Sequence, residues 1–167
     1  MDAQNELKYI HSTINDLLKF GEAKHGGLVV LNSGFVIGLI SSYRNIEHLV
    51  NKPMILLGCI FFGASIFFSI VSLFPNTTNI FHNKKEIENP NIYFFRDLAN
   101  LDKELFISIY KQMDTTFNPT KFHTDLINQI LVIARITRSK FSLFKIASYL
   151  TALGIGVIGI STIIEII

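Results

Sequence analysis

The chain has 167 residues, of which 49% are hydrophobic and 17% are charged, and its formal net charge at pH 7 is +2. The charges are segregated, because residues 26–43, 54–74 and 146–164 contain no Asp, Glu, Lys or Arg. The rest of the chain then has the charge density of an ordinary soluble protein. This distribution excludes a simple water-soluble globule and a disordered chain, and it indicates a small membrane protein with a modest polar part.

Each of the three uncharged windows is long enough to cross a membrane, since a ~30 Å hydrocarbon core needs roughly 20 apolar residues in a helix. The second window lies between Pro53 and Pro75, which favour the start and the end of a helix. The first window is the shortest and carries Asn32 near its middle. The alternative for each is a buried helix of a soluble core, but the charged remainder has little surface to cover three such helices.

The polar segments are predicted to be helical as well. Residues 3–20 show apolar residues at spacings of three and four, which predicts an amphipathic helix, and the glycines at 21, 26 and 27 are expected to loosen its junction with the first span. Residues 75–91, with Lys84 and Lys85, carry turn signals and predict a loop. A second apolar stripe predicts a helix over about 97–113 that buries Leu98, Leu101, Leu105, Ile109 and Met113.

The last predicted helix is unusually long. Asn118 as cap and Pro119 at the first helical position are a good helix start, and no proline and no glycine follow until Gly154. We therefore expect one continuous helix over about 120–164, which at 1.5 Å per residue extends about 67 Å. Its first half is amphipathic, with an apolar face and a separate basic face. The apolar face comprises Phe122, Leu126, Ile130, Ile133, Phe141 and Phe144, and the basic face comprises Arg135, Arg138 and Lys145.

These elements predict an all-α membrane protein with three transmembrane helices and a small cytoplasmic helical part. The expected segments are an N-terminal amphipathic cytoplasmic helix (1–25), a two-helix transmembrane hairpin (26–74), a cytoplasmic helical segment (75–145) and a third transmembrane helix with a short tail (146–167). Only Arg44 and Lys52 of the 15 basic residues fall on the side opposite to 1–25 and 75–145. The positive-inside rule therefore places the N-terminus and 75–145 in the cytoplasm and the C-terminus outside.

The sequence offers little support for an enzyme, a metal site or a nucleic-acid polymer as partner. Residues 75–145 contain no glycine, which excludes a P-loop or a dinucleotide fingerprint there. The five histidines lack metal-ligand spacing, and the single cysteine, Cys59, lies inside the second span as a packing residue. No Lys/Arg run with interleaved aromatics occurs.

Small and polar residues within the spans allow two interpretations. Gly34 and Gly38 form a GxxxG pair in the first span, and small residues including Gly156 align in the third. Such residues let helices approach closely, either within one chain or between copies. Asn32 either forms a hydrogen bond between helices or lines an aqueous path in an oligomer. Lys140 lies at the edge of the apolar face of the long helix. It is either a snorkelling side chain or a basic group that faces a shared polar pocket.

Three segments together resemble the Pycsar transmembrane effector family. Residues 21–40 (GEAKHGGLVVLNSGFVIGLI) are similar to the start of its first span, with Ala23, Lys24 and Asn32 at family positions, although the glycines after His25 depart from the pattern. Residues 91–106 (NIYFFRDLANLDKELF) resemble its Asn-x-x-Phe-Phe segment. Residues 129–147 (QILVIARITRSKFSLFKIA) resemble its stretch through a Lys-aromatic pair into the last span, with Gln129, Lys140 and Phe141 at those positions.

The resemblance implies an antiphage defence effector of the bacterial inner membrane, without catalytic residues. A cyclic pyrimidine nucleotide, cyclic UMP or cyclic CMP, would activate a homo-oligomer that disrupts the membrane and causes abortive infection. Because 75–145 is small and without glycine, we expect the ligand to bind between subunits. Arg96, Arg135 and Lys140 are candidate anion contacts, and Phe94 or Phe95 is a candidate for stacking. Packing aromatics and solvated charges are the alternative for each residue.

Two other functions fit the same pattern. One is a non-gated membrane scaffold or tether whose cytoplasmic helices bind a protein partner. The other is a membrane effector of a different nucleotide-signalling system, which shares the mechanism and differs in ligand. An adjacent nucleotide cyclase gene would favour the Pycsar function.

Overall fold

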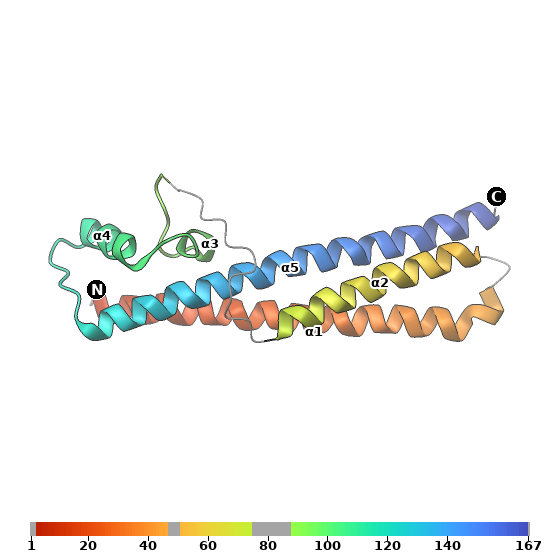
Figure 1. Cartoon of the computed structure of the whole chain (residues 1–167), viewed down its shortest axis with the longest axis horizontal. Helices are drawn as coiled ribbons and strands as arrows, with labels where there is room; N and C mark the ends of the chain where they lie inside the picture. Colours follow the sequence, from red (N-terminus) through yellow and green to blue (C-terminus); the bar gives the residue numbers. More distant parts are fainter. Residues whose placement is uncertain (1–2, 47–50, 75–87, 167) are drawn as a thin grey trace. The chain divides into compact units, whose positions relative to one another are not determined.

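The computed structural model describes residues 3–46, 51–74 and 88–166 (Figure 1). These residues form five helices and no strand, which confirms the predicted all-α class. In chain order the helices are α1 (Ala3–Ile46), α2 (Lys52–Leu73), α3 (Phe95–Leu98), α4 (Lys103–Met113) and α5 (Lys121–Ile166). Of the loop predicted over 75–91, residues 75–87 with Lys84 and Lys85 lie outside the described residues.

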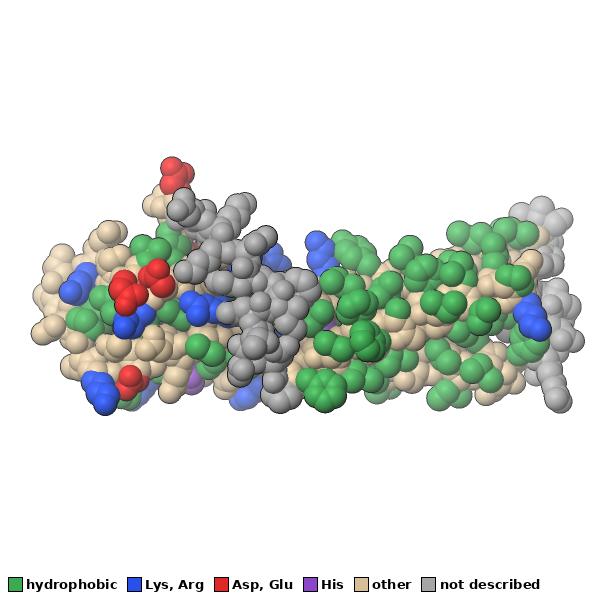
Figure 2. Space-filling model, in the orientation of Figure 1, with side chains coloured by type: hydrophobic (Ala, Val, Ile, Leu, Met, Phe, Trp, Pro, Cys, Tyr) green, Lys and Arg blue, Asp and Glu red, His purple; other side chains and the backbone are tan. Residues whose placement is uncertain are grey.

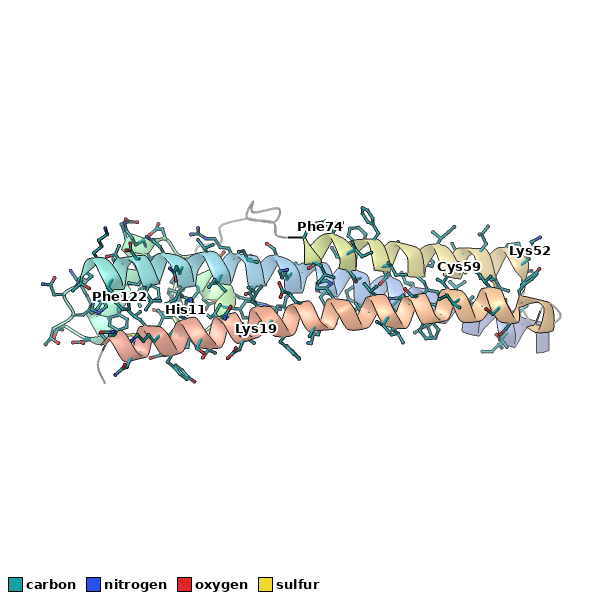
Figure 3. The ribbon with its side chains drawn as sticks, turned by 90° about the horizontal axis from the view of Figure 1, so that it is seen from below. His11, Lys19, Lys52, Cys59, Phe74 and Phe122 are labelled. Atoms are coloured by element: carbon teal, nitrogen blue, oxygen red, sulfur yellow. The ribbon has the colours of Figure 1, made fainter. Side chains whose placement is uncertain are left out.

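Three helices are long and apolar enough to cross a membrane, as predicted. They are found over Ala3–Tyr43, Lys52–Leu73 and Lys121–Ile164. Helix α2 begins as expected, with Asn51 at the N-cap and Pro53 in the first turn. Its ends are marked by Lys52 and Phe74 in Figure 3, and no charged side chain lies between them.

The chain divides into two compact units, and helices α1 and α5 each contribute residues to both. The described residues of unit 1 are 3–21 and 88–141, and those of unit 2 are 22–74 and 142–166. The unit boundaries therefore lie near residues 21–22 and 141–142, inside continuous helices.

Helix α1 runs from Ala3 to Ile46 without a break. The expected loosening at Gly21, Gly26 and Gly27 is wrong, because all three glycines continue the helix. Gly21 faces α5 instead: a Cβ built there would lie 3.5 Å from a ring carbon of Phe141, which is an ordinary van der Waals contact. Gly21 therefore packs beside Phe141 within unit 1.

The single helix predicted over 97–113 is wrong, since the chain is interrupted between α3 and α4. Asp102 restarts the helix as N-cap, and its carboxylate accepts a hydrogen bond from the amide of Leu105 at 2.8 Å. The interruption changes the helical phase, so the predicted stripe is only partly buried. Leu98 and Leu101 are buried, whereas Leu105 and Met113 are exposed and Phe106 and Tyr110 face the core instead.

Helix α5 is continuous as predicted, but it begins slightly later. The cap is Thr120 rather than Asn118, because Thr120 Oγ1 accepts from the amide of His123 and the Thr120 amide donates to His123 Nδ1. The predicted apolar face is confirmed in part, because Ile130 is buried and Leu126, Ile133 and Phe141 pack against the core of unit 1. Phe122 is instead 49% exposed, and the core also takes Ile127, Leu131 and Ala134 from this helix.

Unit 1 encloses a conventional apolar core. Its members come from α1, from the segment leading into α3, from α3, α4 and α5, and they include the stripe predicted for the N-terminal helix. The most buried are Leu7, Ile10, Ile14, Ile92, Leu98, Leu101, Phe106, Tyr110, Ile127, Ile130 and Ala134. His11 on α1 and Phe122 near the start of α5 are labelled in Figure 3 as landmarks of this unit.

In unit 2 many large apolar side chains are exposed, and several polar side chains are buried. Large apolar side chains of α1, α2 and α5 are exposed, and hydrophobic side chains are spread over the face of this unit that Figure 2 shows. The buried positions of α2 include Ser65, Ser69 and Ser72. A surface of this kind matches hydrocarbon rather than water as the surrounding solvent.

Candidate functional site

Two arginines of α5 bind the connection between α3 and α4. Arg135 donates a hydrogen bond from its Nη2 to the carbonyl oxygen of Leu101 at 2.8 Å. Arg138 donates from Nη1 to Asn100 Oδ1 at 2.5 Å, and the amide nitrogen of the Asn100 side chain donates to the Arg96 carbonyl at 2.9 Å. We call Arg96, Asn100, Leu101, Arg135 and Arg138 the arginine cluster. The guanidinium groups of Arg135 and Arg138 thus both bind the α3–α4 connection, and a pair of guanidinium groups of this kind favours an anion as ligand.

The aromatic residues proposed for stacking differ in exposure. Phe94 is 43% exposed, and its ring contacts that of Phe95 at a centroid separation of 5.3 Å. Phe95 is 8% exposed and packs in the core against Phe141, also at 5.3 Å. The Arg96 guanidinium is exposed and lies 5.8 Å from the Phe95 ring centroid. Of the two aromatics, Phe94 therefore has the surface that a planar base requires.

Lys140 lies inside unit 1 and is 7% exposed. Its Cβ is 3.9 Å from where a Cβ on Gly21 would stand, which places it beside α1. This burial disagrees with a snorkelling lysine, which would be more exposed, whereas a basic group facing a polar pocket stays a prediction. Lys140 is therefore buried whereas Arg96 is exposed, although both were predicted to contact an anion.

A second polar cluster joins α1 to α4 and to the segment before α3 within unit 1. The Glu6 carboxylate accepts hydrogen bonds from the hydroxyls of Tyr110, at 2.6 Å, and Tyr93. These two hydrogen bonds, that of Tyr110 first, lower the pKa of Glu6 below its ordinary value. The same bond with Glu6, together with burial, raises the pKa of Tyr93 to about 12. Burial and the Glu6 bond also raise the pKa of Tyr110.

Asn32 is fully buried in unit 2 and connects all three of its helices. Its side-chain nitrogen lies 2.8 Å from the Leu28 carbonyl oxygen, 3.1 Å from Ser65 Oγ and 3.0 Å from Thr151 Oγ1. The expected hydrogen bond between helices is therefore present. Whether Asn32 also lines an aqueous path stays a prediction.

The glycines of the spans separate into two groups, and the predicted packing positions Gly34, Gly38 and Gly156 fall in the first. Gly34, Gly38 and Gly156 meet no atom within 4 Å of an added Cβ, so no close intrachain contact uses them. Gly58 and Gly154 are the tight positions: an added Cβ would lie 2.7 Å from Ile158 and 2.6 Å from Phe62, respectively. Within the described chain, these two glycines carry the close helix packing of unit 2, while the GxxxG pair does not.

Several residues of these clusters were missed by sequence reasoning. Arg138 was placed on a basic face but not in the ligand site, because its partner Asn100 lies in an interruption that the apolar periodicity did not reveal. The signal for that interruption is Asp102, a preferred N-cap residue. Glu6 and Tyr110 are 104 positions apart in sequence, and no local pattern links them.

Two further expectations concern metal and thiol chemistry. Among residues 3–46, 51–74 and 88–166, no group of three His, Cys, Asp or Glu side chains could hold a metal ion. Cys59 is a free, partly buried thiol on α2 (Figure 3).

Comparison with known proteins agrees with the sequence resemblance. The family model of the Pycsar effector protein domain matches residues 6–165. The chain is also 28% identical over 166 residues to the Pycsar effector protein RsPycTM of a Rhizobium species, covering 92% of this chain and 91% of that protein. No solved structure matches this chain. With three membrane-spanning candidates and a family match over nearly its whole length, the chain belongs to the Pycsar effector family and is a bacterial membrane protein with an effector role in antiphage defence.

Proposed function

We propose that this effector binds a cyclic pyrimidine nucleotide, cyclic UMP or cyclic CMP, and then disrupts the inner membrane without catalysing a reaction. The resulting loss of membrane integrity ends the infected cell before phage mature. The observation that carries the proposal is the arginine cluster, because it joins anion-binding groups to α5, the helix that continues into the apolar unit 2.

The arginine cluster can exchange neutral acceptors for a phosphodiester. Arg135 and Arg138 now donate to a carbonyl oxygen and an amide oxygen, both uncharged. A hydrogen bond from a guanidinium to an anionic phosphate is about twice as strong as one between neutral groups. The nucleotide phosphate would therefore displace Leu101 and Asn100 from these arginines, and the exposed Phe94 would stack on the pyrimidine.

Ligand binding then changes a constraint on α5. In the absence of nucleotide, Arg135 and Arg138 tie α5 to the α3–α4 connection. A nucleotide that replaces these bonds has a higher affinity for the state in which α5 is released, and this difference in affinity is what gating requires. Helix α5 extends without interruption from these arginines to Thr151 in unit 2.

The effector is further proposed to act as a homo-oligomer. Gly34 and Gly38 present a GxxxG face that no residue of the described chain approaches closely. In a membrane, such a face favours close helix association between copies. Gly156 on α5 is open in the same way.

The proposed topology has the N-terminus and residues 75–145 in the cytoplasm and the C-terminus outside. It rests on the concentration of basic residues in that part of the sequence. This orientation exposes the arginine cluster to a nucleotide made inside the cell.

The test combines binding and leakage with the full-length protein in liposomes. Titration with cyclic UMP and cyclic CMP should show saturable binding of one of them, and the same nucleotide should release an encapsulated dye. The double variant Arg135→Ala/Arg138→Ala should lose both responses. Lys121→Ala, which removes an exposed positive charge from the same helix, is the matched control and should keep both.

Two outcomes would contradict the proposal. Unchanged nucleotide affinity in the double arginine variant would place the ligand elsewhere. Liposomes that stay intact with every cyclic nucleotide, together with a protein that co-purifies with the effector, would instead support a non-gated tether.

A further inference from the structure

The interior of unit 2 carries a row of polar side chains between its three helices. Asn32 of α1, Ser65 of α2 and Thr151 of α5 form its central layer, and all three are buried. Ser65 and Thr151 both donate their hydroxyl protons to the carbonyl oxygen of Ala147, at 2.8 and 3.0 Å. The Asn32 nitrogen, with two protons, faces three oxygens.

The row continues for at least one helical turn beyond that layer. Helix α2 is antiparallel to α5, since Gly58 packs against Ile158 and Ser65 bonds Ala147. Ser69 follows Ser65 by four residues, and Ser148 precedes Thr151 by three, so both lie one turn from the central layer in the same direction. We call Asn32, Ser65, Ser69, Ser148 and Thr151 the polar seam.

Polar atoms of the seam remain without protein partners. Asn32 Oδ1, Ser69 Oγ and Ser148 Oγ are buried and make no hydrogen bond to any described residue. Leaving such atoms unpaired in an apolar environment is unfavourable, because each has lost its hydration without gaining a hydrogen bond in exchange. Water is the ligand that satisfies isolated amide and hydroxyl oxygens of this kind.

On the other side of the central layer, apolar groups pack between the helices. The Phe62 ring stacks on that of Phe35 at a centroid separation of 5.1 Å, and Gly154 lies directly against Phe62. One turn further along α2, Ile158 packs against Gly58. An apolar constriction of this kind excludes water and ions until it widens, which is a known way to gate a pore.

We propose that the polar seam is the path by which water and small hydrated ions cross the membrane when the effector is active, and that Phe62 closes this path at rest. The proposal rests on the membrane disruption proposed above and names the residues that carry it. Amide and hydroxyl oxygens replace part of the hydration shell of an ion, and the seam supplies them from all three helices of unit 2.

Cysteine accessibility tests this path directly. In a Cys59→Ala background, Ser69→Cys places a thiol in the seam with little change in volume, and Ile70→Cys places one on the exposed apolar face next to it. Proteoliposomes would be treated with a membrane-impermeant, charged thiol reagent, with and without cyclic UMP or cyclic CMP. We expect the Ser69→Cys thiol to react at least several-fold faster while the nucleotide induces leakage, and the Ile70→Cys thiol to stay unreactive.

A second experiment needs no nucleotide. Phe62→Ala should open the constriction and leak dye several-fold faster than Phe67→Ala, which removes an exposed ring from the same helix. Circular dichroism of both variants confirms that they are folded. A folded Phe62→Ala protein as tight as Phe67→Ala overturns the role of Phe62.

The remaining outcomes separate this inference from the proposed function. Nucleotide-induced leakage with an unreactive Ser69→Cys thiol overturns the seam as the path and leaves the proposed function standing. Absence of leakage with either nucleotide overturns the proposed function, and a tight Phe62→Ala protein in the same preparation overturns the seam as well.

Discussion

Units 1 and 2 are both helical, but unit 1 has a mainly apolar interior and unit 2 has an interior with many polar side chains. Unit 1 buries Phe106, Tyr110 and Leu98 behind a polar and charged surface. Unit 2 buries Asn32 and Ser65 behind a surface of exposed Ile, Leu and Phe side chains. The contrast shows that the surrounding solvent, rather than the helices themselves, decides which side chains face inward.

The two interiors are therefore stabilised by different forces. In water, removing apolar area from solvent stabilises unit 1 by about 25 cal/mol per Å². Lipid tails are as apolar as leucine, so unit 2 gains little from burying leucine and depends on close packing and hydrogen bonds between helices. The glycines at 58 and 154 and the hydrogen bonds of Asn32 supply these two contributions.

The largest expected effect comes from emptying the apolar core of unit 1. Phe106 is fully buried, and Phe106→Ala should destabilise unit 1 by about 3–5 kcal/mol through lost burial and a residual cavity. Hydrogen exchange measured by mass spectrometry should show faster exchange in α4 and in residues 121–134 of α5. Phe122→Ala, which removes a half-exposed ring from the same unit, should change exchange far less. Equal effects of the two variants would contradict the assigned core.

An intermediate effect is expected from overpacking unit 2. Gly154→Leu adds a side chain whose Cβ alone would lie 2.6 Å from Phe62, and overpacking of this kind typically costs about 1–3 kcal/mol. Thermal unfolding of the protein in detergent should shift to lower temperature. Gly34→Leu meets open space in the single chain, so it should leave the transition unchanged and instead reduce chemical cross-linking between copies. A destabilised Gly34→Leu protein with normal cross-linking would reverse the roles assigned to these glycines.

The smallest effect concerns the acidic contact of unit 1. The folded pKa of Glu6 is lowered from an ordinary value of 4.5, so its stabilising contribution is present above that value and is lost as pH falls through the folded pKa. The folded pKa of Tyr93 is raised from 10.0 to about 12, so its contribution is present below 10.0 and is lost as pH rises through about 12. The protection of α4 amides, corrected for their intrinsic exchange rate at each pH, should therefore be greatest between these limits.

Glu6→Gln is the control for this pH dependence. The variant keeps a hydrogen-bond acceptor without a charge. The loss of amide protection at acidic pH should therefore be smaller than in the wild type, and the stability at neutral pH should fall slightly. If Glu6→Gln loses amide protection at acidic pH as the wild type does, that loss comes from another carboxyl group.

Local sequence patterns predicted the three apolar helices, the continuity of α5 and the amphipathic N-terminal helix correctly, but not that its stripe of Leu7, Ile10 and Ile14 packs in the core of unit 1. They failed where one residue outweighed the periodicity. Asp102 interrupts the helix predicted over 97–113, and Thr120 replaces Asn118 as the cap of α5. In the candidate site, Arg96 and Arg135 were identified from their charge, whereas Arg138 was missed because its acceptor lies in the interruption.

The sequence by itself determined that this is a membrane protein, how many of its helices are long and apolar enough to cross a membrane and which family it resembles, because uncharged windows and motif order are properties of the chain. Only the tertiary structure decided which polar residues are brought together. The hydrogen bonds of Asn32 with Ser65 and Thr151, like those of Glu6 with Tyr93 and Tyr110, join residues far apart in sequence. Their geometry depends on the register in which whole helices pack, and close packing at Gly58 and Gly154 sets that register in unit 2.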